Sequence, residues 1–218
     1  MNDKYLVIDL ETGPQPEAQA ERFAPQFSAP GNYKDQVKID AYIADARKDW
    51  LESCALSPLT GTLLAVGVQS ESSEITTFTI SEFESESTFI DITLRSLDVE
   101  IGRGAVIVGF NVRHFDIPFL MRRAWILGVR VPLTVTMAVQ KRYSTEIVDL
   151  MDVWLCGERE FKGQSLKNIA LACGIGEKTG DGAEFARLFT ADRFAALEYL
   201  KNDVQLTVAL AKRLCVVE

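Results

Sequence analysis

Two short apolar runs, residues 4–10 and 105–110, restrict the chain to folds that bury strands in a core. Both runs are rich in Val, Ile and Leu and are short for a core helix, so each predicts a buried strand. From residue 165 onward, apolar residues recur instead at helical spacing. Early strands with flanking helices are typical of an α/β domain. We therefore expect residues 1–218 to form a single α/β domain.

The other expected elements follow from periodicity and from turn residues. A hairpin is predicted over residues 62–69 and 74–80, and a further strand over 146–155. Residues 13–32 hold four of the seven prolines and indicate an irregular, Pro-rich insertion. Helices are expected over residues 38–50, 81–100, 117–127, 165–173, 183–189 and 192–213.

The charge of the chain is acidic as a whole but basic in one segment. Lys and Arg total 23 against 31 Asp and Glu, a net charge of -8, which argues against a passive nucleic-acid coat. Residues 103–142 hold seven basic residues and a single acidic one. This segment is either a phosphate-contacting surface or a solvated helix face. Its basic residues are Arg103, Arg113, Arg122, Arg123, Arg130, Lys141 and Arg142.

The sequence also predicts where in the cell the protein is found. No apolar run approaches the roughly 20 residues that span a bilayer, and the N-terminus shows no secretory h-region or cleavage site. The four cysteines form no CxxC pair, which is typical of reduced thiols. We therefore expect a cytoplasmic protein with no membrane contact, present as a monomer or weak oligomer.

Carboxylates mark the end of the first predicted strand. Asp9 and Glu11 are two residues apart, so a strand presents both side chains on one face. Two carboxylates this close repel each other unless a cation lies between them, and Mg²⁺ prefers oxygen ligands. The pair is therefore either a metal site or an acidic strand end before a loop.

Further polar residues follow in a fixed order. Asp116 is the last residue of an N-x-x-x-F-D segment that follows the strand at 105–110. It is either a site residue or a helix cap. Tyr199 and Asp203 share a helix face, although tyrosine at this spacing is commonly a core residue. Asp149, in an apolar run, is either a neighbour of the site or a polar residue at a strand end. The order D-x-E, N-x-x-x-F-D, Y-x-x-x-D is far more specific than any one cluster.

This ordered pattern resembles motifs I, II and III of the DEDD 3′–5′ exonucleases in their tyrosine variant. The N-x-x-x-F-D form is similar to the proofreading domain of family-B DNA polymerases, and the chain looks like the free-standing relatives of that domain. The resemblance implies the ribonuclease-H-like fold, with a central mixed five-stranded sheet flanked by helices. The histidine variant is excluded, because the single histidine, His114, does not stand five residues before the last aspartate.

The resemblance also implies an activity and its residues. The implied enzyme is a 3′–5′ exonuclease that hydrolyses single-stranded DNA from the 3′ end with two divalent ions, Mg²⁺ or Mn²⁺. Tyr199 would orient the attacking water, because an ordinary tyrosine pKa of roughly 10 makes it a poor base. The implied metal ligands are Asp9, Glu11, Asp116 and Asp203.

Five residues are expected to contact the substrate. Lys178 opens the segment 178–182, which is either a backbone nest for phosphate or a plain turn before a helix. The full expected set is Thr12, Asn111, Arg113, Phe115 and Lys178.

Other functions stay open at this point. The same motifs fit an exoribonuclease that trims RNA 3′ ends, so the expected partner is nucleic acid, with DNA favoured and RNA possible as substrate. A non-catalytic nucleic-acid-binding module is disfavoured, because all four carboxylates and the tyrosine are present. A ribonuclease-H-type endonuclease is disfavoured, because it does not combine D-x-E with a C-terminal Y-x-x-x-D helix.

Overall fold

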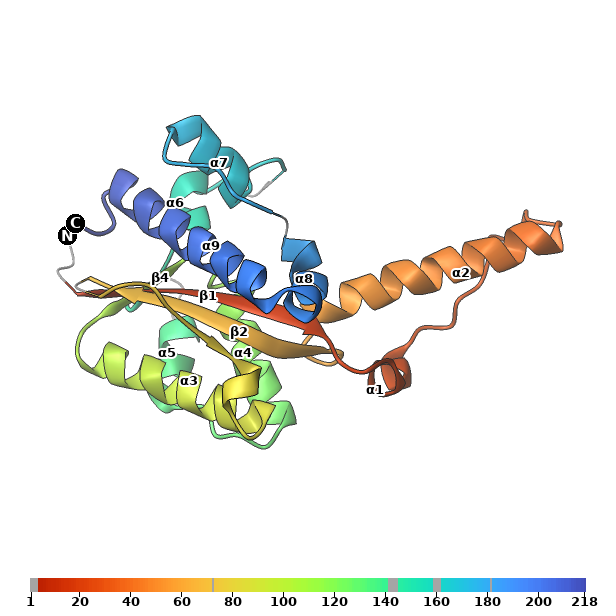
Figure 1. Cartoon of the computed structure of the whole chain (residues 1–218), viewed down its shortest axis with the longest axis horizontal. Coiled ribbons are helices and arrows are strands. Elements are labelled where there is room, and N and C mark those ends of the chain that lie inside the picture. Colours follow the sequence, from red (N-terminus) through yellow and green to blue (C-terminus); the bar gives the residue numbers. More distant parts are fainter. Residues whose placement is uncertain (1–3, 72, 141–144, 159–161, 181) are drawn as a thin grey trace.

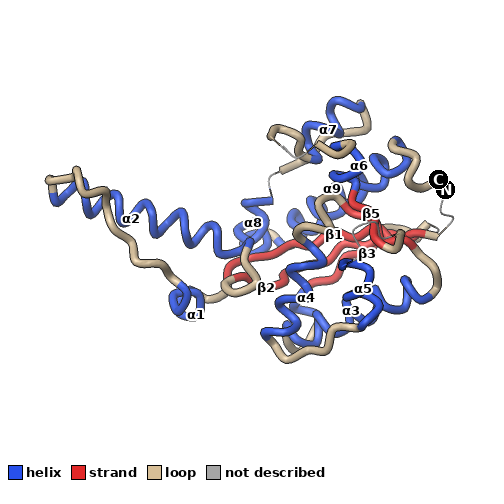
Figure 2. Tube along the Cα trace, turned by 180° about the vertical axis from the view of Figure 1, so that it is seen from behind, coloured by secondary structure: helices blue, strands red, loops and turns tan. Residues whose placement is uncertain are grey.

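Five strands form one mixed sheet at the centre of the molecule. They are β1 (Tyr5–Pro14), β2 (Gly61–Ser70), β3 (Thr76–Thr79), β4 (Val106–Gly109) and β5 (Ile147–Asp149). The order is β3-β2-β1-β4-β5, antiparallel from β3 to β1 and parallel from β1 to β5. Figure 2 shows the strands in red, with helices on either side of them. The computed structural model describes residues 4–71, 73–140, 145–158, 162–180 and 182–218. The predicted α/β class and the mixed five-stranded sheet are confirmed.

Helices cover both faces of this sheet (Figure 1). One face is covered by α6 (Leu150–Leu155), α7 (Leu166–Cys173), α8 (Phe185–Ala191) and α9 (Arg193–Arg213). The other face is covered by α3 (Glu86–Gly102), α4 (Asp116–Ile126) and α5 (Leu133–Gln140). Short 3₁₀ turns are η1 (Glu21–Phe23), η2 (Cys54–Leu56), η3 (Ile80–Glu82) and η4 (Gly182–Glu184). None of the helices in the described part of the chain is long and apolar enough to cross a membrane.

The alternation of side chains along β1 divides the core in two. Tyr5 and Val7 point toward α9 and its neighbours, whereas Leu6 and Ile8 point toward α3 and α4. All four are 9% exposed or less, so β1 is buried on both faces. This explains why its sequence is a continuous apolar run up to the first acidic residue.

A helical arm leaves the body between β1 and β2. After β1 the chain forms α1 (Glu17–Ala20), an extended segment and α2 (Gln36–Ser53), which projects away from the sheet (Figure 1). No residue of α2 is buried. The extended segment packs along α2 through two aromatic pairs, with ring centroids 5.9 Å apart for Phe27 and Trp50 and 5.7 Å for Tyr33 and Tyr42.

The structure differs from the expected elements in several places. The segment 13–32 is not irregular throughout, because β1 continues to Pro14 and the chain then forms α1 and η1. The strand predicted over 146–155 is wrong beyond Asp149, because the Asp149 side chain accepts a hydrogen bond from the Met151 amide and starts α6 there. Helix α5 was not predicted, since its sequence is rich in Thr and Val. It forms because Val135 and Ala138, three residues apart, are both buried against the core beneath the sheet.

A buried ion pair joins three elements on the face opposite α9. Arg123 of α4 donates to both carboxylate oxygens of Glu86 at 2.9 and 2.8 Å, and Glu86 also accepts from the Leu63 amide of β2 at 2.9 Å. The two charged side chains are 7% and 13% exposed. Removing one partner of such a pair leaves the other charge buried and uncompensated.

We expect Glu86→Gln to lower the free energy of unfolding by about 3 kcal/mol, because the Arg123 charge loses its counterion. Chemical denaturation measures the change. The control is Glu100→Gln, which breaks the surface pair with Arg103 and should cost no more than about 1 kcal/mol. Equal losses in the two variants would contradict the assignment of Glu86 as a structural anchor.

Candidate active site

Three carboxylates meet where β1 passes beneath α9. Asp9 and Glu11 lie on the face of β1 that also carries Val7, and Asp203 lies on the inner side of α9. One oxygen of each carboxylate lies within 4.8 Å of the others. Glu11 and Asp203 are 7% and 3% exposed, and Asp9 is partly buried. This arrangement offers a divalent cation three oxygen ligands at one point.

Gly67 of β2 allows α9 to lie this close to the sheet. It is paired with Asp9 across the β1–β2 ladder, and a Cβ atom at this position would lie 2.7 Å from Val204 Cγ2 and 3.0 Å from Leu200 Cγ. A larger residue would therefore push away the turn of α9 that carries Asp203. Sequence reasoning missed Gly67, although a glycine inside an apolar strand often marks a close approach.

Asp116 reaches the same strand from the other side. It is the first residue of α4, it is 4% exposed, and its Oδ1 accepts a hydrogen bond from the Leu10 amide at 3.0 Å. β1 pairs with β4 only as far as Val7, so this carboxylate satisfies an amide that lies beyond the paired stretch. Leu10 stands between Asp9 and Glu11, so the bond holds Asp116 next to the three-carboxylate cluster.

The carboxyl groups are difficult to ionise in the metal-free protein. Burial raises the pKa of Asp9 and of Glu11 well above the usual range, and the neighbouring carboxylates raise both further. Burial also raises the pKa of Asp116 to about 7. The pKa of Asp203 is raised by burial but lowered by the ammonium group of Lys178. Concentrated, desolvated acids of this kind are a physical sign of a functional site.

Lys178 and Tyr199 complete the cluster. Lys178 Nζ lies 2.5 Å from Asp203 Oδ2 and 5.0 Å from the centre of the Tyr199 ring. Among the described residues, neither the Tyr199 hydroxyl nor Asp203 Oδ1 has a hydrogen-bond partner of good geometry, although both atoms are buried. A buried carboxylate oxygen without a donor suits a cation ligand. The residues present therefore fit a divalent metal ion.

The expected substrate-binding residues lie in different surroundings. Thr12 is buried at a β-bulge next to Glu11, and Phe115 is partly buried immediately before Asp116. Asn111 begins the β4–α4 loop in a left-handed conformation with φ 64°. The guanidinium of Arg113 donates to the Ile147 carbonyl and is thereby held against β5.

The basic segment splits into residues with different environments. Arg123 is held in the buried ion pair, and Arg103 pairs with Glu100. Arg122 and Arg130 are exposed. Lys141 and Arg142 lie outside the described residues. The segment is therefore not one continuous phosphate-binding surface, because two of its arginines neutralise carboxylates of the chain itself.

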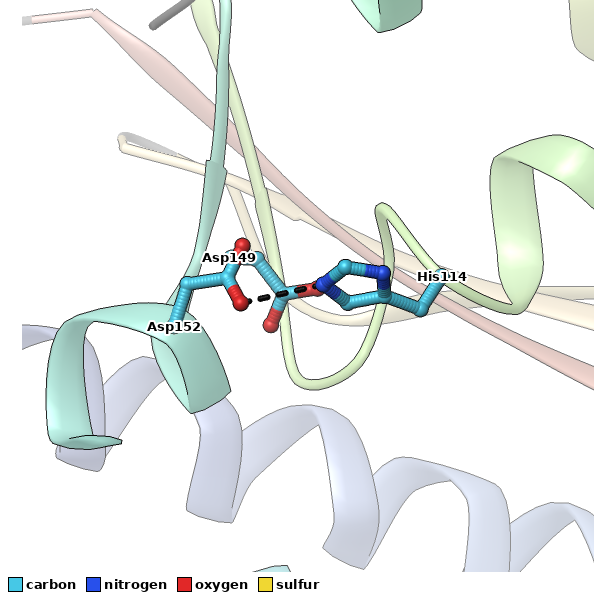
Figure 3. Close-up of side chains that lie close together, drawn as sticks. All are labelled: His114, Asp149 and Asp152. Carbon is cyan, nitrogen blue, oxygen red and sulfur yellow. Dashed lines mark hydrogen bonds and ion pairs between the residues drawn. The ribbon is translucent and has the colours of Figure 1, made fainter. Parts of the chain in front are cut away.

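A second polar cluster lies beside the β4–α4 loop (Figure 3). His114 Nε2 is 3.0 Å from Asp152 Oδ1, and Asp149 lies next to them. Asp149 is 2% exposed and its two oxygens accept three backbone hydrogen bonds. We interpret this cluster as a hydrogen-bonded network, because the buried carboxylate is already occupied by amide donors.

Comparisons with known proteins agree with the geometry. A family model described as "Predicted 3'-5' exonuclease related to the exonuclease domain of PolB" matches residues 61–218. These residues include Asp116, Tyr199 and Asp203, whereas Asp9 and Glu11 lie upstream and join them only in space. No curated protein sequence matches the chain.

The fold also matches a solved polymerase structure. The family B DNA polymerase from the hyperthermophilic archaeon Pyrobaculum calidifontis aligns with a TM-score of 0.62 and 19% identity. The alignment covers 99% of this chain and 25% of the polymerase chain, so this chain spans about a quarter of that protein. At this identity the match establishes the fold, which is the ribonuclease-H-like α/β fold expected from the motifs.

We expect the metal-free protein to lose stability as the pH rises. The pKa of Asp116 is 3.8 when unperturbed and about 7 in the fold, so its protonated form favours the folded state and that contribution is lost between these values. Thermal unfolding in a chelator should show a midpoint several degrees lower at pH 8 than at pH 5, and Mn²⁺ should reverse the loss at pH 8. An Asp116→Asn variant with the same pH dependence as the wild type would contradict this explanation.

We expect Gly67→Ala to weaken Mn²⁺ binding and to lower stability by about 1–3 kcal/mol, the range for an overpacked core. The added methyl group would contact Val204 and move Asp203 away from Asp9. Calorimetric titration with Mn²⁺ measures the affinity. Val204→Ala in the same chain should restore part of the binding, because it removes the shorter contact and leaves the one with Leu200 at 3.0 Å. Gly102→Ala, whose new methyl group would meet no neighbouring atom within 4 Å, is the control. A double variant that binds no better than Gly67→Ala would exclude this contact as the cause.

Proposed function

The chain belongs to the family of predicted 3′–5′ exonucleases related to the exonuclease domain of the DNA polymerase PolB, and on this premise we propose its substrate and mechanism. The substrate is the 3′ end of single-stranded DNA, and the reaction is metal-dependent hydrolysis of the terminal phosphodiester bond. Residues 1–218 act as one exonuclease domain. The observation that carries the proposal is the convergence of Asp9, Glu11 and Asp203 within 4.8 Å.

The four carboxylates are the proposed metal ligands. Asp9, Glu11 and Asp203 supply oxygens at one point, and Asp116 approaches from the start of α4. When two Mg²⁺ or Mn²⁺ ions are bound, they neutralise charge on the phosphate and activate the attacking water. The buried, unpartnered Asp203 Oδ1 supports this assignment, since a metal ion would satisfy it.

Tyr199 is proposed to hold the attacking water and not to remove its proton. Burial raises the pKa of the Tyr199 hydroxyl above its ordinary value, and the nearby Asp203 and Glu11 carboxylates raise it further. The hydroxyl therefore keeps its proton at neutral pH and can donate or accept one hydrogen bond. Its buried oxygen interacts with Asp203 but has no hydrogen bond of good geometry among the described residues, so it is available to a water molecule at the site.

Lys178 is proposed to provide positive charge for the scissile phosphate. Its ammonium group is 18% exposed and bonded to Asp203, so it lies at the site in the metal-free protein. Cations that occupy Asp203 would compete with this contact and leave the ammonium free to meet a phosphate oxygen. Phe115 and Asn111, on the loop that leads into Asp116, are the proposed contacts for the terminal nucleotides.

The decisive assay follows a single-stranded DNA oligonucleotide labelled at either end. With Mg²⁺ or Mn²⁺, a 5′ label should give a ladder of shortening products, and a 3′ label should be released as a mononucleotide. Asp9→Ala and Asp203→Ala should lose activity and metal binding. Tyr199→Phe should lose much of the rate, on the order of 10²-fold or more, and keep metal binding. Asp45→Ala, on the exposed face of α2, is the control.

The same assay separates the alternatives. Cleavage of a circular strand would contradict strict dependence on an end. Faster hydrolysis of an RNA strand of equal sequence would replace the DNA substrate with RNA and favour 3′-end trimming. Binding of DNA without hydrolysis in the presence of either metal would favour a non-catalytic module. Near-normal turnover by Asp203→Ala would overturn the assignment of the metal ligands.

A further inference from the structure

One buried carboxylate, that of Asp149, holds the β4–α4 loop through hydrogen bonds to its backbone. Asp149 Oδ1 accepts hydrogen bonds from the Asn111 amide at 2.8 Å and from the Met151 amide at 2.9 Å. Asp149 Oδ2 accepts from the Arg113 amide at 2.9 Å. The residue is 2% exposed. A single side chain thus binds two backbone amides of the loop and the first turn of α6.

The loop has a conformation that needs such a restraint. Asn111 has φ 64°, in the left-handed region that glycine adopts freely and that asparagine tolerates better than most other residues. Strained residues of this kind persist where the surrounding structure over-determines them. Asp149 provides that restraint, because it binds the amide of Asn111 itself and the amide two residues later.

The restrained loop leads directly into the active site. The Phe115 amide donates to the Asn111 carbonyl at 2.9 Å, so the position of Asn111 sets the position of Phe115, the residue just before α4. The next residue, Asp116, bonds the Leu10 amide between Asp9 and Glu11. Hydrogen bonds therefore connect the end of β5 to the β4–α4 loop, and the start of α4 to β1, the strand that carries Asp9 and Glu11.

We propose that Asp149 is a positioning residue of the exonuclease, which holds the 111–116 loop so that its side chains meet the 3′ end and the metal site. The inference rests on the proposed function. Asp149 binds the loop through the backbone amides of Asn111 and Arg113 and has no hydrogen bond to Asp9, Glu11, Asp116 or Asp203 among the described residues. Burial raises the pKa of the Asp116 carboxyl group, and the charge of Asp149 raises it further. Residues that orient metal ligands and substrate contacts in this way are typically needed for full activity.

Capping of α6 does not by itself explain why residue 149 is an aspartate. Capping of α6 requires only the bond from the Met151 amide, and asparagine caps a helix as well as aspartate. In Asp149→Asn the remaining oxygen can keep the bonds to Asn111 and Met151. The new amide group would face the Arg113 amide, and two donors cannot bond each other. This substitution therefore removes one of the two bonds to the loop backbone while it preserves the cap.

The experiment compares Asp149→Asn with two controls. Asp152→Asn changes a half-exposed carboxylate of the same helix, which contacts the side chains of His114 and Arg113 but accepts no bond from the loop backbone among the described residues (Figure 3). Glu86→Gln also removes a buried carboxylate that accepts a backbone amide, but its partner Arg123 is in the last turn of α4, at the other end of that helix from the 111–116 loop. Each protein is assayed at a temperature at which it is fully folded.

Two readouts are combined. Amide hydrogen exchange in chelator, followed on the peptide that covers residues 109–116, should become faster in Asp149→Asn and stay unchanged in both controls. Exonuclease assays with 5′-labelled single-stranded DNA and Mn²⁺ should show kcat/KM reduced on the order of tenfold, mainly through a higher KM. Glu86→Gln should lower the thermal midpoint and leave KM unchanged.

The possible failures are distinct. Unchanged exchange in Asp149→Asn would overturn the proposal, and so would faster exchange with unchanged kinetics, because Asp149 would then serve the fold alone. Equal kinetic losses in Glu86→Gln would also overturn it, since any loss of stability would then suffice. A wild-type protein that hydrolyses no 3′ end would contradict the proposed function, a result obtained before any variant is compared.

Discussion

Repulsion between buried carboxylates is the constraint on which the site depends. Asp9, Glu11, Asp116 and Asp203 are brought together from β1, α4 and α9, and their desolvation makes each of them harder to ionise. The chain places Lys178 against Asp203, which offsets part of this charge. In the metal-free protein the cluster therefore opposes folding, and the surrounding structure must hold it in place.

Backbone contacts provide much of that support. Gly67 lets α9 approach the sheet, and the Leu10 amide holds Asp116. Asp149 in turn binds the backbone of the loop that precedes Asp116. These restraints leave the carboxylates of Asp9 and Glu11, and one oxygen of Asp203, directed toward one another. Within the described part of the chain, a scaffold of this kind fixes the positions of the carboxylates while it occupies only one oxygen each of Asp116 and Asp203.

The sequence predicted those parts of the molecule that depend on local pattern. The apolar run before Asp9 predicts a strand buried on both faces, and the spacing of Tyr199 and Asp203 predicts a shared helix face; the structure has both. Contacts between distant segments could not be predicted in this way. The orientation of Arg113 toward β5 depends on the Ile147 carbonyl, which no local pattern reveals.

The site is built from the first and the last long elements of the described chain. Asp9 and Glu11 lie on β1, whereas Asp203 lies on α9, nearly two hundred residues later, and the two elements pack directly on each other. During synthesis, β1 leaves the ribosome long before α9 exists. A nascent chain therefore lacks Asp203 until α9 has been synthesised. The three-carboxylate cluster is complete only when α9 has packed on β1.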